Sequence, residues 1–71
     1  MPEDIKAHIT GVVFQVVAHS GDAVQEGDPV IVLESMKMEI PVESPRAGRL
    51  RDVKVEEGQT VQEGEVVATL E

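Results

Sequence analysis

The chain has 71 residues, enough for one small domain, and its 14 acidic and 6 basic residues give a formal net charge of −8. This charge repels a phosphate backbone, and Phe14 is the only aromatic residue that could stack on bases, so the composition excludes a nucleic-acid-binding protein. No stretch approaches the roughly 20 apolar residues that cross a membrane. Because there is no cysteine and the acidic start is unlike a secretory signal, we expect a soluble, cytoplasmic monomer.

The kinds of apolar residue favour an all-β fold. Thirteen are Val and four are Ile, against three Leu, and β-branched side chains suit a pleated sheet better than a helix. Six Gly and four Pro divide the chain into short runs, which is typical of a β-barrel or a β-sandwich. In chain order, strands are predicted near residues 4–9, 12–17, 23–24, 30–35, 38–43, 49–55, 60–61 and 66–70.

The chain also contains an internal repeat. Residues 11–34 and 48–71 align without a gap at an offset of 37, and ten of the 24 positions are identical, including three Gly pairs and a whole Val-Gln-Glu-Gly tetrapeptide. Neither half could bury its apolar face alone, so we expect the halves to pack with pseudo-twofold symmetry into one domain over residues 1–71. The link at residues 34–39 is then a hairpin tip at one pole, and the two chain ends lie at the other.

The predicted tip carries a distinctive motif, which reads Glu34-Ser35-Met36-Lys37-Met38-Glu39. A Met-Lys-Met triplet between two repeated halves resembles the biotinyl domain of biotin-dependent carboxylases, in the biotin/lipoyl attachment family that includes the biotin carboxyl carriers. The resemblance covers nearly the whole chain, and Ser44-Pro45 with Gly48 is similar to the start of the family's second half. It implies a flattened β-barrel (a barrel-sandwich hybrid) of two four-stranded antiparallel sheets.

The same resemblance implies a function. A biotin protein ligase would attach the cofactor biotin to Lys37, and a biotin carboxylase and a carboxyltransferase would load and unload it, so the domain would be a carrier and not an enzyme. The chemistry explains the lysine, because a deprotonated amine is a nucleophile and forms a stable amide. A tight hairpin presents this amine without burying it. The resulting tether, on the order of 12 Å long, would let the cofactor visit two active sites in turn.

The residues beside Lys37 favour biotin over lipoate. The related lipoyl domains place Asp before their lysine and Ala after it, whereas this chain has Met36 and Met38. The flexible, polarizable side chain of Met suits shallow apolar contact with the ligase or the carboxylase. A lipoyl carrier for a 2-oxo acid dehydrogenase-type complex is the alternative, and the mass of the group on Lys37 separates the two.

Three polar residues complete the predicted recognition segment. Glu34, Ser35 and Glu39 flank the triplet, and the two acids either set the register of the hairpin in the ligase or are simply solvated. The following residues 39–42 resemble the stand-alone attachment proteins more than the carriers fused to large carboxylases. The family's motif near the start is reduced here to Ala7 and Gly11, and the first half has no inserted loop that could contact biotin.

Simpler interpretations compete with this one. The triplet at 36–38 could lie in an ordinary strand with its methionines inside, and the chain could be an unmodified adaptor that only binds proteins. His8 and His19 lack metal-ligand spacing, so no metal site is predicted. The acid pairs at 26/28 and 63/65 occupy matching Gly turns, and duplication of a solvated turn explains them better than a catalytic carboxylate pair.

Overall fold

The structure is a computed structural model that describes residues 2–71, and it is all-β. Its strands are β1 (Glu3–Lys6), β2 (Gly11–Val16), β3 (Ala23–Val24), β4 (Pro29–Ser35), β5 (Met38–Glu43), β6 (Gly48–Val53), β7 (Thr60–Val61) and β8 (Val66–Leu70). These bounds lie within one residue of the predicted map, except that β1 ends at Lys6 and β6 at Val53. The register shifts after Ile5, and the buried Ala7 donates its N–H to the Glu65 carbonyl (2.9 Å), so the chain bends out of the ladder there.

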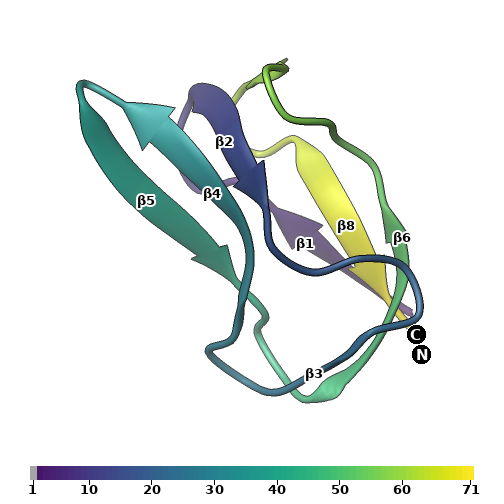
Figure 1. The fold of residues 1–71 in the computed structure, drawn as a ribbon. Helices are drawn as coiled ribbons and strands as arrows, with labels where there is room; N and C mark the ends of the chain where they lie inside the picture. Colours follow the sequence, from purple (N-terminus) through teal and green to yellow (C-terminus); the bar gives the residue numbers. More distant parts are fainter. Residues whose placement is uncertain (1) are drawn as a thin grey trace.

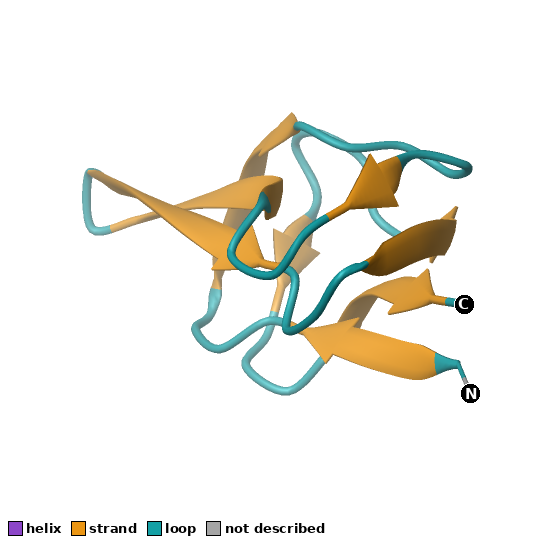
Figure 2. Cartoon of the chain, turned by 90° about the horizontal axis from the view of Figure 1, so that it is seen from below, coloured by secondary structure: helices purple, strands orange, loops and turns teal. Residues whose placement is uncertain are grey.

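The strands form two four-stranded sheets that face each other (Figures 1 and 2). One has the order β5-β4-β2-β7, contains the β4–β5 hairpin and is called the hairpin sheet here; the other has the order β1-β8-β6-β3, contains both terminal strands and is called the terminal sheet. All pairs are antiparallel. Each sheet takes strands from both halves of the repeat, because β7 crosses to pair with β2 and β3 crosses to pair with β6.

The pseudo-twofold symmetry extends to individual bonds. Val13 donates its N–H to the Gln59 carbonyl (2.8 Å), and 37 residues later Leu50 donates to the Asp22 carbonyl (2.9 Å). The register shift in the β2–β4 pair recurs in the β6–β8 pair at the same offset. Duplicated bulges and bonds cannot come from a shared Val-rich composition, so the flattened barrel of two symmetry-related halves is confirmed.

The core lies between the sheets and is almost entirely aliphatic. Its largest fully buried side chains are Ile31, Leu33, Leu50, Leu70, Val13, Val30, Val42, Val61 and Val67. Burying one such side chain contributes about 1.5–3 kcal/mol before the entropy of ordering is subtracted. The two halves of the repeat therefore contribute equivalent aliphatic side chains to the core. No disulfide stabilises the fold, because the chain has no cysteine.

The acid pairs in the Gly turns have a structural role. Asp28 accepts a hydrogen bond through Oδ2 from the N–H of Gln25 (2.9 Å), and Glu65 accepts one through Oε1 from the N–H of Gln62 (3.1 Å). Each carboxylate thus closes its own turn, where the glycine adopts a positive φ of +88° or +89°. Asp28 and Glu65 therefore hold equivalent turns in the two halves of the repeat. The residues that the structure describes include no helix with the length and apolar character needed to cross a membrane.

Candidate cofactor attachment site

The link between the two halves is the tightest kind of β-hairpin. Ser35 at the end of β4 pairs with Met38 at the start of β5, which leaves only Met36 and Lys37 in the turn. Their φ angles are +52° and +63°. Two consecutive positive φ values define a type I′ turn, whose twist matches that of the flanking strands. Lys37 therefore lies at the tip, as predicted, and the hairpin projects beyond the body of the barrel (Figure 1).

The turn is strained because of the residues it uses. Type I′ turns usually contain Asn-Gly, since a side chain with a Cβ clashes with its own backbone at positive φ. Met36 and Lys37 are the only described residues other than glycine with a positive φ. Each costs about 1 kcal/mol or more, and strain of this kind gathers at functional sites. The chain keeps Met and Lys at positions where Asn and Gly would be more stable.

The side chains at the tip lie in solvent. Lys37 is exposed, Met36 is 92% exposed and Met38 is 62% exposed. Two large apolar side chains gain nothing from burial here, so they do not serve the core and the ordinary-strand interpretation of the triplet is wrong. Within residues 2–71, no group forms a hydrogen bond or an ion pair with the Lys37 amine. An exposed, unengaged amine with open space around it fits a group attached by an amide bond.

The three polar residues of the recognition segment lie at the root of the turn. Glu34 and Glu39 are opposite each other across the β4–β5 pair, and both are exposed. Like charges in directly opposite positions disfavour the pairing, so this placement does not serve the sheet. Ser35 is half-buried and faces Met38 across the last rung. The structure thus brings all six predicted residues together within the two strand ends and their turn.

Two residues beside the site were missed from the sequence. Val12 pairs with Glu34 on the other side of β4, and it is 40% exposed. Phe14 follows it on β2 and is 50% exposed. The repeat contains a signal for both, because the equivalent residues of the second half are Arg49 and Arg51. An apolar residue aligned with an arginine indicates an outward position.

Metal-ligand geometry is absent from the described part of the chain. Within residues 2–71, no group of three or more His, Cys, Asp or Glu side chains is close enough to hold an ion. His19 lies 3.9 Å through Nδ1 from Oδ2 of Asp22, the acid that also accepts the His19 N–H (2.9 Å). These contacts hold an exposed turn together.

Comparison with known proteins agrees with this geometry. The family model described as "Biotin-requiring enzyme" matches residues 1–70. A biotinylated protein TB7.3 homolog from Mycobacterium leprae is 43% identical over 70 residues, which are 99% of each chain. The biotin carboxyl carrier protein of acetyl-CoA carboxylase from Solanum lycopersicum is 42% identical over 60 residues, covering 84% of this chain and 86% of that protein.

Among solved structures, the Kluyveromyces lactis urea carboxylase contains a matching domain. It superimposes with a TM-score of 0.93 at 33% identity, over 99% of this chain and 6% of that chain. The chain therefore matches one small part of that carboxylase. Because the family model spans almost every residue and the relatives match over most of their own length, the chain belongs to the biotin/lipoyl attachment family.

Proposed function

We propose that residues 1–71 form one carrier domain to which biotin is attached through Nζ of Lys37. The amine attacks the activated carboxyl group of biotin, an amide bond forms, and the activating group and a proton leave. The observation that carries this proposal is an exposed lysine in a strained two-residue turn, where no packing or hydrogen bonding explains its presence. The domain supplies the nucleophile, and the enzyme that modifies it supplies the activation.

Biotin, and not lipoate, is the cofactor that the family match supports. The model that matches the chain is described as biotin-requiring, and the M. leprae relative is described as biotinylated. The residues beside the lysine agree, because Met36 and Met38 replace the Asp and Ala of lipoyl domains. Both methionines are largely exposed, so a modifying enzyme can contact them before it reaches Lys37.

The proposed role is that of a biotin carboxyl carrier. Bound biotin would supply a ring nitrogen that accepts and releases a carboxyl group. The chain itself holds the base of the tether rigid through the β4–β5 ladder and leaves the rest free to move. A tether on the order of 12 Å raises the local concentration of the cofactor at a partner's active site. The domain catalyses no step in this scheme.

The proposed partners are a biotin protein ligase, a biotin carboxylase and a carboxyltransferase, all acting in the cytoplasm. The S. lycopersicum relative is named as the carrier of acetyl-CoA carboxylase, and the K. lactis structure is a urea carboxylase. The acidic surface and exposed methionines of this chain suit transient contact with basic protein surfaces. An isolated domain with a charge of −8 repels its own copies, which supports a monomer.

Mass spectrometry of the intact protein tests the proposal, because an attached cofactor raises the mass of the chain. The protein is incubated with a biotin protein ligase, ATP and biotin, and in parallel with a lipoate ligase, ATP and lipoate. We expect one biotin adduct per chain, located on Lys37 by peptide mapping and absent from Lys37→Arg. Lys54→Arg is the matched control and keeps the adduct. A lipoyl adduct without a biotin adduct would favour the alternative cofactor, and no adduct of either kind would favour an unmodified adaptor.

A further inference from the structure

The pseudo-twofold symmetry allows the outer faces of the two sheets to be compared position by position. Four positions on the outer side of the hairpin sheet are apolar, and all four equivalents on the terminal sheet are polar. Two of these eight residues are covered by their neighbours, since Val32 is half-buried and Thr69 is buried. The pairs are Val12 and Arg49, Phe14 and Arg51, Val32 and Thr69, and Pro41 and Asp4. Since the two backbones are equivalent, folding does not require apolar side chains at these positions. We call Val12, Phe14, Val32 and Pro41 the apolar face.

The bulge in β2 displays Phe14. Val13 pairs with Leu33 and Gln15 pairs with Val32, so Phe14 is the extra residue between them. Val13 is buried and Val16 is half-buried, while both residues between them are exposed. The bulge therefore turns two consecutive side chains outward, and the only aromatic ring of the chain lies half in solvent. Bulges often redirect a side chain in this way beside functional sites.

The apolar face adjoins the attachment site. Val12 is opposite Glu34, which lies three residues before Lys37, so the near edge of the face is about 10 Å from the tip. Pro41 lies four residues after Lys37 on β5 and pairs with Val32. A protein that covers this face also reaches the lysine. No such relation holds for the terminal sheet, because the two chain ends occupy the place equivalent to the hairpin and lie at the other end of the molecule (Figure 1).

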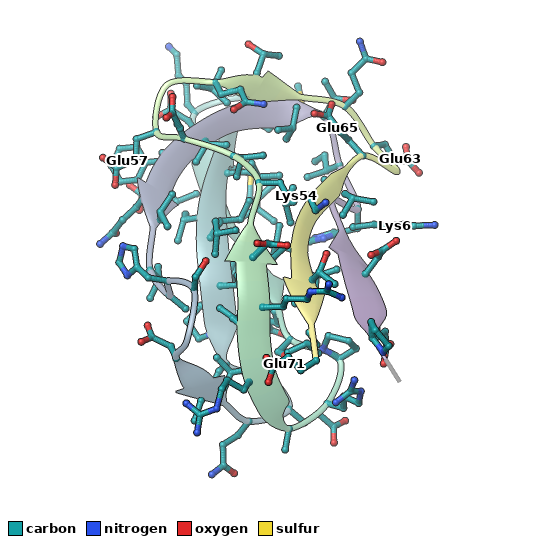
Figure 3. All side chains as sticks on the ribbon, turned by 90° about the vertical axis from the view of Figure 1, so that its right-hand side faces the viewer. Lys6, Lys54, Glu57, Glu63, Glu65 and Glu71 are labelled. Atoms are coloured by element: carbon teal, nitrogen blue, oxygen red, sulfur yellow. The ribbon has the colours of Figure 1, made fainter. Side chains whose placement is uncertain are left out.

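Charge separates the two sheets as well. The four strands of the hairpin sheet contain no Lys or Arg, but they contain Glu34, Glu39 and Glu43. The equivalent of Glu43 on the terminal sheet is Lys6, which is labelled in Figure 3 together with Lys54. Lys54 stands where the first half has Val17, which is 40% exposed. The strands of the apolar face thus carry acids and no cation, with Lys37 only in the turn beyond them, whereas the strands of the terminal sheet carry Lys6, Arg49 and Arg51.

These properties define the surface that fits the apolar face. It has an apolar centre that can receive the Phe14 ring, and lysine or arginine side chains around that centre to meet the acids of the hairpin sheet. A second copy of this chain does not fit, because the acids of two hairpin sheets would be brought together. An anionic membrane surface does not fit for the same reason.

We propose that the apolar face is the docking surface for the ligase that acylates Lys37, and that Phe14 is its central contact. This inference rests on the proposed function, since it assumes that a ligase acts on the hairpin. The ligase meets the unmodified chain and must recognise it from the protein surface alone. The tip gives it two methionines and a lysine, and the apolar face extends the contact along the same sheet.

The symmetry supplies the variant that tests the proposal. Val12→Arg with Phe14→Arg installs the residues that the terminal sheet already carries at the equivalent positions, so the fold is preserved. With purified biotin protein ligase, biotin and ATP, we expect the KM for the chain to rise about tenfold or more while kcat changes by less than twofold. Circular dichroism and urea unfolding of the variant confirm that it folds.

Two controls isolate the contact from the charge. Glu26→Gln with Asp52→Asn removes two negative charges, which shifts the net charge by the same two units. Both residues are exposed, and Asp52 lies on the terminal sheet, so the KM of this variant should stay within about twofold of the parent. Arg51→Phe places an aromatic ring on the terminal sheet and should not improve KM. For the parent chain, KM should rise with ionic strength because the hairpin sheet carries acids.

The outcomes separate the two proposals. If the parent is biotinylated on Lys37 and the double-Arg variant has the parent's KM, the docking surface is overturned while the carrier function stands. A KM that does not change with salt overturns the basic side chains assigned to the ligase. A parent dimer that the double-Arg variant abolishes assigns the face to a second copy and overturns the proposal. A parent that acquires no adduct overturns both inferences.

Discussion

The two poles of the molecule occupy equivalent places in a duplicated fold but are closed in different ways. At the hairpin pole, a covalent two-residue turn joins β4 to β5, with strained backbone and exposed side chains. At the terminal pole, no peptide link joins β1 to β8, and the side chain of Arg46 adds a bridge between Glu3 and Glu71 to the β1–β8 ladder. Its Nε donates to Oε1 of Glu3 (2.8 Å), and its Nη2 donates to the Glu71 carbonyl (2.9 Å).

This difference shows that side chains at one pole stabilise the fold, whereas side chains at the other pole remain available to bind a partner. At the terminal pole, the side chain of Arg46 forms hydrogen bonds within the protein. At the hairpin pole, the side chains of Met36, Lys37 and Met38 form none and lie in solvent. The covalent link makes this possible, because the turn holds the strand ends together without help from side chains. Substitutions at matched positions of the two poles can break or sharpen the contrast.

The largest expected difference is in the stability lost when Gly11 or Gly48, the first residues of β2 and β6, is replaced by Ala. A Cβ at Gly11 would lie 2.7 Å from the backbone carbonyl oxygen of Glu34, which cannot move without shifting the root of the hairpin. A Cβ at Gly48 would meet Nη1 of Arg46 at 2.8 Å, the far end of a flexible side chain. We expect Gly11→Ala to lower the free energy of unfolding by about 1–3 kcal/mol, measured by urea denaturation.

Gly48→Ala is the matched control for that substitution. It should cost well under half as much, because the Arg46 guanidinium can rotate aside. Gly11→Ala should also shift the amide resonances of residues 34–39, whereas Gly48→Ala should shift those near Arg46. Equal losses of stability would contradict the idea that the hairpin root is the less adjustable of the two poles.

Next in size is the removal of the Arg46 bridge. Arg46→Ala should lower the free energy of unfolding by about 1 kcal/mol, since a partly exposed ion pair and a hydrogen bond to a carbonyl are lost together. The ion-pair share should shrink in high salt. Arg51→Ala removes an exposed guanidinium from the neighbouring strand and should cost less than about 0.5 kcal/mol. Biotinylation should be unaffected, because the bridge lies far from Lys37.

The smallest expected effect is a gain in stability at the turn itself. Met36→Asn places a residue that tolerates positive φ at the first turn position, and it should raise the free energy of unfolding by about 0.5 kcal/mol. The same substitution removes an exposed methionine from the recognition segment and should slow biotinylation by the ligase. Met38→Asn, which lies outside the turn, is the control that loses a methionine without relieving strain. A destabilised Met36→Asn protein would mean that the turn is not strained at this residue.

The repeat explains why so much of the fold could be predicted. The Gly pairs and the offset of 37 located every strand, including the two-residue strands β3 and β7, and they placed residues 34–39 at a pole. Hydrophobic alternation could not reveal the bulges, because an extra residue such as Phe14 breaks the alternation without changing the composition. Alternation alone therefore could not predict that Phe14 is half exposed.

The local geometry of the tip could not be predicted either. The turn contains neither Asn nor Gly, so the residues Met36 and Lys37 do not predict two positive φ angles. The pairing of β4 with β5 on both sides imposes these angles. The Arg46 bridge depends on bringing Glu3 and Glu71 together from opposite ends of the chain. Contacts of this kind follow from tertiary closure and leave no mark in short sequence windows.

The separation of the poles has a practical consequence. The molecule measures 33 Å along its long axis and 17 Å across, and both chain ends emerge at the end away from the hairpin (Figure 1). A peptide tag, a linker or a surface anchor added at either terminus would therefore leave Lys37 unobstructed. The same layout would let the domain serve as a cassette that is grafted onto a larger protein while its cofactor points away from the graft.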